Sequence, residues 1–131
     1  MKRDVYSGQL KLKGEEHMDT LIAANNYAAG FLVLQRYQEA KSLLRRTVPM
    51  ARRVLGDSHD LTLKMRKIYA AALYRDDGAT LDDVREAVTT LEEIERIARR
   101  VLGGTNPTVG SIVRALQAAR EMLSERESPN A

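Results

Sequence analysis

The sequence predicts an all-α protein, a right-handed superhelical stack of antiparallel helix hairpins. Three observations predict this fold class. Six identical residues, ARRVLG, occur at Ala51–Gly56 and again at Ala98–Gly103, which indicates an internal repeat. Apolar residues recur at steps of three and four, the period of a helix that buries one face. No segment shows the alternation of apolar and polar residues that a half-buried strand needs.

The repeat unit is 42 residues long, because His17 and His59 occupy the same place in consecutive units, 42 positions apart. The two ARRVLG copies are 47 positions apart, because the second unit carries five extra residues rich in Asp and Gly, as an extended turn should be. The chain is therefore divided into an N-terminal extension or remnant of a preceding repeat (1–13), repeat 1 (14–56), repeat 2 (57–103, with the insertion near 75–83), a capping helix (104–126) and a tail (127–131).

About five helices are expected. They span about Met18–Leu34, Tyr37–Leu55, Asp60–Arg75, Leu81–Leu102 and Pro107–Glu125, followed by a polar tail, SPNA. Gly56 suits the residue that follows a helix, and Asn106 before Pro107 suits a helix start. Pro49 lies inside the second helix and should kink it or break it near Arg45. The fifth helix should cap the second hairpin and turn its polar residues to water, namely Arg114, Gln117, Glu121 and Glu125.

Composition excludes several classes of function. The chain has no Cys, so neither disulfides nor thiol chemistry are available. No apolar run approaches the roughly 18 residues of a membrane span, and the N-terminus is too polar for a signal peptide. We therefore expect the protein in the cytoplasm or the nucleus. The net charge of +3 tilts partners toward acidic surfaces, but acidic and basic residues are intermixed, which disfavours nucleic acid.

The residues that could carry chemistry favour structural roles. His17 and His59 fall in adjacent repeats about 10 Å apart, too far to share a zinc ion, so junction packing and capping are expected. The carboxylates of Asp76, Asp77, Asp82 and Asp83 flank Gly78, but they lack the spacing of a calcium loop, which favours a solvated turn. No nucleophile, base and acid form a set, so we expect no enzyme activity, no catalytic residue, no metal and no cofactor.

A family resemblance rests on three short motifs. They are Gly14…His17…Thr20-Leu21, the pair Asn25-Asn26, and Tyr37-Gln38-Glu39-Ala40. Together with the 42-residue hairpin, these motifs make roughly residues 12–110 resemble the kinesin light chain type of tetratricopeptide repeat. The resemblance implies that the first helix of each hairpin lines a concave face, where Asn25 and Asn26 hold a peptide backbone. The Asn pair is replaced by Lys67-Ile68 and by Arg114-Ala115 in the later units.

Aligned positions on the first helices of the hairpins predict a partly basic groove. The stripe comprises Ile22, Asn25, Ala29 and Val33, then Lys64, Lys67, Ala71 and Arg75, and finally Ser111, Arg114, Ala118 and Met122. Small residues at its centre would leave a floor open to a ligand backbone. The peptide-binding residues expected from this stripe are Asn25, Asn26, Ala29, Lys64, Lys67, Ala71, Arg75 and Arg114. An ordinary solvated helix face remains an equal alternative for this stripe.

We interpret the chain as a non-catalytic protein-interaction module that presents this groove to a peptide or protein segment with acidic residues. The alternative is a structural or self-assembling segment of a larger scaffold; nucleic-acid binding is a weaker one, because aromatic stacking platforms are nearly absent. Asp4–Lys13 contains Gly8 and is weakly patterned, so the outer face of the first hairpin near Tyr27 and Phe31 should lack cover. Self-association through that end is therefore expected.

Overall fold

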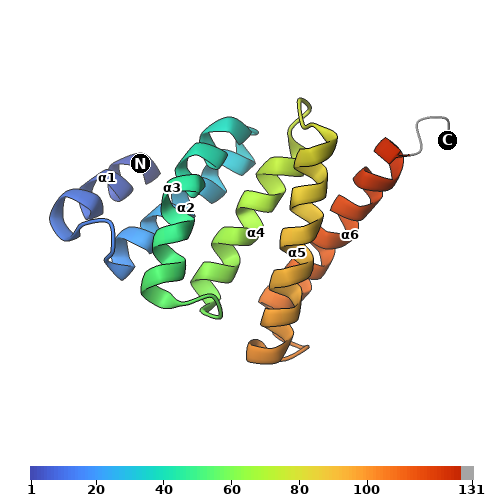
Figure 1. The fold of residues 1–131 in the computed structure, drawn as a ribbon. Coiled ribbons are helices and arrows are strands. Elements are labelled where there is room, and N and C mark those ends of the chain that lie inside the picture. The colour runs from blue at the N-terminus through green and yellow to red at the C-terminus, as the bar shows by residue number, and fades with distance from the viewer. Residues whose placement is uncertain (128–131) are drawn as a thin grey trace.

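The computed structural model describes residues 1–127, and in that range six α-helices pack as antiparallel neighbours in the order of the sequence (Figure 1). They are α1 (Lys2–Lys13), α2 (Met18–Val33), α3 (Tyr37–Leu55), α4 (Asp60–Arg75), α5 (Leu81–Leu102) and α6 (Pro107–Glu127). The predicted all-α stack of helix hairpins is confirmed. The expected polar tail SPNA, residues 128–131, lies outside the described residues, and α6 extends through Glu127, which we had expected to begin the tail.

Glycine ends the helix at each hairpin junction. Gly14, Gly56 and Gly103 follow α1, α3 and α5 with φ of 85°, 93° and 84°. This left-handed region is accessible to glycine without the clash that a Cβ would cause. The backbone N–H of each glycine donates to the carbonyl four residues earlier, which closes the last turn of the helix. The ARRVLG repeat is therefore the last turn of a helix together with its terminating residue.

Histidine begins the next helix at two of these junctions. The Nδ1 atom of His17 accepts a hydrogen bond from the backbone N–H of Asp19 at 3.0 Å, and Nδ1 of His59 accepts one from Leu61 at 3.1 Å. Both histidines have extended backbone angles, as an N-cap residue does. The expected capping role of the two histidines is confirmed. At the third junction, Asn106 takes the same place, because its Oδ1 atom accepts from the N–H of the residue two positions later at 2.8 Å.

The helices form two layers that differ in how closely their members approach. Neighbours within the layer of α2, α4 and α6 come within 8 Å of each other, measured between Cα atoms. The helices α1, α3 and α5 make no such approaches to one another. The stack therefore curves, with α2, α4 and α6 on its inner side, and this inner layer consists of the first helices of the successive hairpins.

The helix α4 lies at the centre of the stack and contributes to two hydrophobic cores. Its residues Leu61, Met65 and Ala72 pack into one core with α1, α2 and α3. Its residues Leu63 and Leu73, on another side of the helix, pack into a second core with α5 and α6. Because two sides of α4 are occupied by packing, the residues left over form a narrow row on the inner surface of the stack.

The N-terminal segment corrects two of our expectations. It forms a sixth helix, α1, although Gly8 lies within it, and this helix packs along α2 (Figure 1). The expectation that the first hairpin lacks cover near Tyr27 and Phe31 is therefore wrong, because α1 packs there. The ring of Tyr6 lies 6.0 Å from that of Tyr27, which in turn lies 4.4 Å from that of Phe31, as measured between centroids. Phe31 is buried and Tyr27 is half-buried. The packing of these rings against Tyr6 stabilises α1, and the sequence pattern of α1 alone does not reveal this contact.

Pro49 does not break the second helix of the first hairpin. The helix α3 runs without interruption from Tyr37 to Leu55 with Pro49 inside it. The predicted break near Arg45 is therefore wrong, and the alternative, a kink of the helix, stays a prediction. Packing in the core stabilises this helix, because Leu44 and Ala51 are fully buried on either side of the proline.

Candidate functional site

A cavity of about 440 Å³ opens on the inner layer of the stack, where α2, α4 and α6 meet. We call it the groove. It is lined by Ala29, Leu32, Val33, Lys67, Ile68, Ala71, Tyr74, Arg75, Ser111, Arg114, Ala115 and Ala118. The structure thus brings together five of the eight residues that the sequence singles out for peptide binding, namely Ala29, Lys67, Ala71, Arg75 and Arg114.

The charged residues of the groove are all cations. Lys67 and Arg75 come from α4, and Arg114 comes from α6. In residues 1–127, no carboxylate lies within ion-pair distance of any of these three side chains. Burial in the groove lowers the pKa of the Lys67 ammonium, and the like charges of Arg75, Arg114 and Lys64 lower it further. The groove therefore holds positive charge that no carboxylate of residues 1–127 pairs with; Lys67 is half-buried, whereas Arg75 and Arg114 are exposed.

Two contacts fix the positions of these cations. The Nζ atom of Lys67 donates a hydrogen bond to Oγ of Ser111 across the gap between α4 and α6. The guanidinium of Arg114 lies next to Gly110, near the start of α6. This position follows from the short distance of 3.4 Å between its Nη1 atom and a Cβ built on Gly110. The Arg114 head group and the Lys67–Ser111 pair therefore occupy the same end of α6.

Lys64 and Asn25 belong to a neighbouring hollow rather than to the main cavity. The hollow also borders Lys67 and Ser111, so it continues the groove toward the start of α6. The ammonium of Lys64 lies 3.0 Å from a carboxylate oxygen of Asp60, one turn earlier on α4, so its charge is already paired. The Oδ1 atom of Asn25 is buried and accepts no hydrogen bond from residues 1–127. This oxygen therefore stays an unsatisfied acceptor inside the wall of the hollow, away from its open surface.

Asn26 lines neither the groove nor the hollow beside Lys64, although it shares a hollow with Ala29. It borders a hollow between α1 and α2, together with Lys2, Val5, Ala23 and Ala29. One step along a helix rotates a side chain by about 100°, which carries Asn26 away from the surface that Asn25 faces. The two amides of the Asn pair therefore do not act on one surface.

The predicted open floor is only partly open. Ala71 is 3% exposed and packs into the second core, so it forms the base of the groove without a free surface of its own. Ala29 is half-buried and Ala118 is exposed. These small side chains leave room above α4, and the apolar wall of the groove is completed by α2 through Leu32 and Val33.

Several residues of the groove were not among the predicted binding residues. They are Leu32, Val33, Ile68, Tyr74, Ser111, Ala115 and Ala118. Val33, Ser111 and Ala118 fall on the stripe that the repeat alignment marks, so the sequence carried a signal for them. Leu32, Tyr74 and Ala115 lie next to that stripe and also pack in or against the second core. Their apolar character in the sequence therefore indicates a core position and does not indicate the groove.

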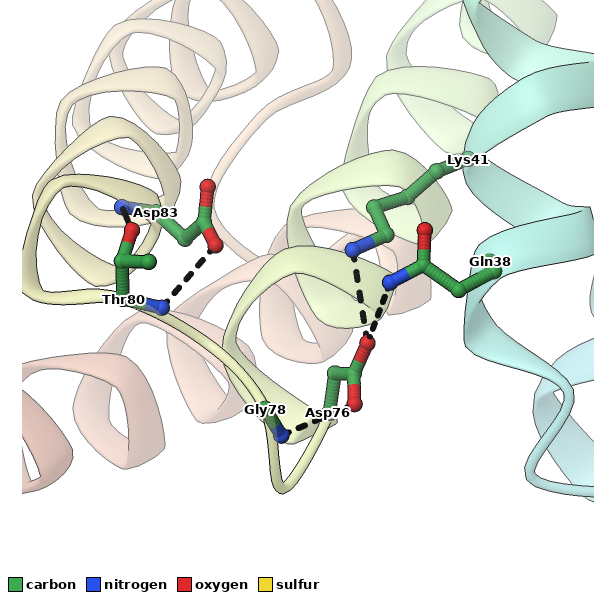
Figure 2. Close-up of polar contacts among 6 residues, drawn as sticks. All are labelled: Gln38, Lys41, Asp76, Gly78, Thr80 and Asp83. Carbon is green, nitrogen blue, oxygen red and sulfur yellow. Dashed lines mark hydrogen bonds and ion pairs between the residues drawn. The ribbon is translucent and has the colours of Figure 1, made fainter.

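The acidic turn between α4 and α5 forms hydrogen bonds with other residues of the protein (Figure 2). One carboxylate oxygen of Asp76 accepts from the backbone N–H of Gly78 at 3.0 Å. The other accepts from Gln38 at 2.8 Å and from the ammonium of Lys41 at 3.4 Å, both on α3. These hydrogen bonds lower the pKa of the Asp76 carboxyl, the bond from Gly78 most strongly.

The second half of the turn forms a capping box at the start of α5. The Oγ1 atom of Thr80 accepts from the N–H of Asp83 at 3.1 Å, while the Asp83 carboxylate accepts from the N–H of Thr80 at 3.0 Å (Figure 2). Asp76 and Asp83 thus serve the fold. Within residues 1–127, no three His, Asp or Glu side chains gather in a way that could hold a metal ion.

The comparisons with known proteins add no relative. No protein-family model matches the sequence, and a search of curated proteins finds no match either. Among residues 1–127, no helix is both long enough and apolar enough to cross a membrane.

Proposed function

We propose that this chain is a non-catalytic protein-interaction module that binds an acidic segment of a partner in the groove between α2, α4 and α6. One observation carries the proposal: Lys67, Arg75 and Arg114 line one cavity, and no carboxylate of the described chain pairs with them. The mutual repulsion of like charges that line one cavity is a cost to the free protein. A ligand that brings negative charge removes this cost, which favours binding and speeds encounter.

We also propose that the hairpins are tetratricopeptide repeats of the kinesin light chain type. The 42-residue unit, the glycine that ends each second helix and the histidine that begins the next first helix support this proposal. In such repeats the first helices line the binding face, which agrees with a groove built by α2, α4 and α6. Asn25, which borders the hollow next to the groove, would then contact the backbone of the ligand through its side-chain amide.

The test is a charge reversal of the groove with a control of equal charge. One variant carries Lys67→Glu, Arg75→Glu and Arg114→Glu. The control carries Lys11→Glu, Arg96→Glu and Arg100→Glu, all at exposed positions outside the groove. Both variants lower the net charge equally, so any difference between them reports position rather than total charge.

We expect the groove variant to lose binding to an acidic peptide library, together with the salt dependence of that binding, while the control binds like the wild type. Circular dichroism should show that both variants stay helical. Single substitutions are less informative, because an exposed charge pair contributes only about 0.2–1 kcal/mol. Equal binding by the groove variant and the wild type would contradict the proposal. Tighter binding of a nucleic acid than of any acidic peptide at physiological salt would replace it.

A second candidate, self-association, is favoured by the apolar surface of α1. Val5 and Leu12 are 56% and 81% exposed on this helix. Sedimentation at high protein concentration tests it against the variant Val5→Ser with Leu12→Ser, which should remove any association that the wild type shows. A wild type that stays monomeric throughout the concentration series would exclude this candidate.

A further inference from the structure

The donors that meet in the groove outnumber what one carboxylate can accept. Two guanidinium groups, one ammonium and the hydroxyl of Ser111 line the same cavity. A carboxylate has two oxygens and one negative charge. The three cations together carry three positive charges, so a single Asp or Glu of a ligand would leave most of this charge, including part of that around the half-buried Lys67, without a partner.

The walls of the groove do not compensate this charge. The helix α2 contributes the apolar residues Ala29, Leu32 and Val33. On α4, the carboxylate of Asp60 is committed to Lys64. On α6, Ser111 accepts a hydrogen bond from Lys67 and Arg114 adds a further positive charge. The charge that the groove lacks must therefore come from its ligand.

We propose that the acidic group this groove holds is a phosphorylated side chain of the partner protein, bound by Lys67, Arg75 and Arg114 with Ser111 beside it. This inference rests on the proposed function, because it names the acidic group of the segment. A phosphate monoester carries about −1.5 to −2 charges at pH 7 and three terminal oxygens. These numbers match two guanidinium groups and one ammonium better than a carboxylate does, since guanidinium forms paired hydrogen bonds to phosphate oxygens.

The surroundings of the cations suit a side chain presented by an extended segment. The exposed Ala118 and half-buried Ala29 leave space beside the cations, and the groove continues past Lys67 into the hollow that Asn25 and Lys64 border. An extended segment could therefore run along both. The low pKa that burial and like charges impose on Lys67 would be relieved by the bound dianion.

The first experiment uses inorganic phosphate and acetate as probes on the complete protein. Each is titrated at constant ionic strength while the backbone amide resonances are followed by NMR. At pH 7.5 we expect phosphate to shift resonances of the groove residues on α4 and α6, with an affinity at least fivefold higher than that of acetate. At pH 5 the preference should shrink, because the second ionisation of phosphate has a pKa near 6 to 7. Protonation of a histidine at low pH would strengthen anion binding, so it does not produce this loss.

Matched variants locate the effect. Arg75→Gln with Arg114→Gln should abolish the preference for phosphate, whereas Arg96→Gln with Arg100→Gln, at exposed positions of α5, should leave it unchanged. Glutamine removes the charge and the paired guanidinium donors while it keeps a polar side chain at each position. Phosphate shifts that persist in the first variant, or that lie outside the groove, would show an adventitious ion only and overturn the inference.

The second experiment separates this inference from the function on which it rests. Three peptide libraries share the same degenerate flanks and carry a fixed phosphoserine, Glu or Ser at the centre. We expect the phosphoserine library to bind at least tenfold more tightly than the Glu library, and the Ser library to bind least. Equal binding of the phosphoserine and Glu libraries would overturn the phosphate preference and leave the proposed function standing. Binding of neither library would overturn both, as would tighter binding of a single-stranded oligonucleotide through the same three cations.

Discussion

The two ends of the stack differ in how their terminal helices are held. At the C-terminal end, α6 buries Val109, Ile112, Leu116 and Ala119 almost completely in the second core. Its outward residues are polar: Arg114, Gln117, Glu121 and Glu125 are all exposed, as the sequence predicts. At the N-terminal end, Tyr6 is the buried residue among the twelve described residues of α1, and this helix leaves Val5 and Leu12 exposed.

Ion pairs follow the same division. The guanidinium of Arg120 on α6 lies 2.9 Å from Glu92 on α5, and that of Arg126 donates to the carbonyl of Ala79 at 2.6 Å. The helix α1 is held to α2 through fewer such contacts, namely an ion pair between Lys13 and Asp19 and a hydrogen bond of 3.1 Å from the Thr20 hydroxyl to the Gln9 carbonyl. The difference teaches that α6 completes the stack, whereas α1 covers one aromatic cluster and still exposes apolar surface.

The largest effect that tests this comparison is the loss of a terminal helix. Deleting residues 107–131 should expose the second core, because Ile112 and Leu116 leave behind the apolar surface that they cover. We expect aggregation or the loss of a cooperative thermal transition. Deleting residues 1–13 should instead lower the melting temperature and keep the transition cooperative. Calorimetry and light scattering of the two truncated proteins would contradict the comparison if the two deletions behaved alike.

The next effect concerns the joint between the two hairpins. Asp76→Asn should lower the free energy of unfolding by about 2 kcal/mol, because Lys41 is 4% exposed and would lose its carboxylate. Asp77→Asn is the matched control at the exposed neighbouring position and should change little. If the contact between Lys41 and Asp76 couples the two ends of the stack, the N-terminal half of the Asp76→Asn variant should unfold at a lower urea concentration than its C-terminal half.

The same pair predicts a dependence on pH. The folded protein holds the pKa of Asp76 below its ordinary value, so the pair stabilises the fold above the ordinary carboxylate pKa, near 4. This contribution is lost as the pH falls from there through the lower pKa of the folded state. The wild type and Asp76→Asn should therefore converge in stability in strong acid, and a difference that stayed constant from pH 7 to pH 2 would contradict this assignment.

A smaller effect compares the same cap in the two repeats. His17→Ala and His59→Ala each remove the acceptor for a backbone N–H at the start of a helix, which typically costs about 1 kcal/mol. The cost should be felt more at His59, because α4 serves both cores, than at His17 near the less firmly held end. Asn at either position keeps an acceptor and should restore most of the stability in chemical denaturation.

The smallest effect lies within α1. Gly8→Ala should stabilise the protein by about 0.5–1 kcal/mol, because a Cβ at this helical position meets no atom within 4 Å. Gly14→Ala is the contrasting change: the space is equally open there, but φ is +85°, so the substitution should destabilise. Thermal melts of the two variants that moved in the same direction would show that α1 does not have the backbone described here.

Most of the fold follows from short-range patterns. Three helices, Tyr37–Leu55, Asp60–Arg75 and Leu81–Leu102, have the bounds that the sequence predicts, because their apolar period is strong and a glycine or a capping residue marks their ends. The helix α1 escaped detection because the contact that stabilises it is tertiary. Tyr6 packs against Tyr27, and no local pattern around Gly8 reveals this packing.

The candidate site was predictable to the extent that the repeat register places it. Lys67 and Arg114 occupy equivalent positions of successive units, and the inner layer brings both to one cavity. Asn26 does not line that cavity, because neighbouring residues on a helix face different directions. The contact between Lys41 and Asp76 joins residues 35 positions apart, so it depends on how the hairpins pack, which a repeat alignment does not specify.

The double commitment of α4 has a consequence for how such a module could change its specificity. Because two sides of this helix are fixed by the cores, the residues that remain variable on the groove side form one row, in which Lys64, Lys67 and Arg75 stand about a turn or two apart. The side chains of this row can therefore be substituted without disturbing either core. Replacing them by those of another repeat should transfer a binding preference and leave the fold intact.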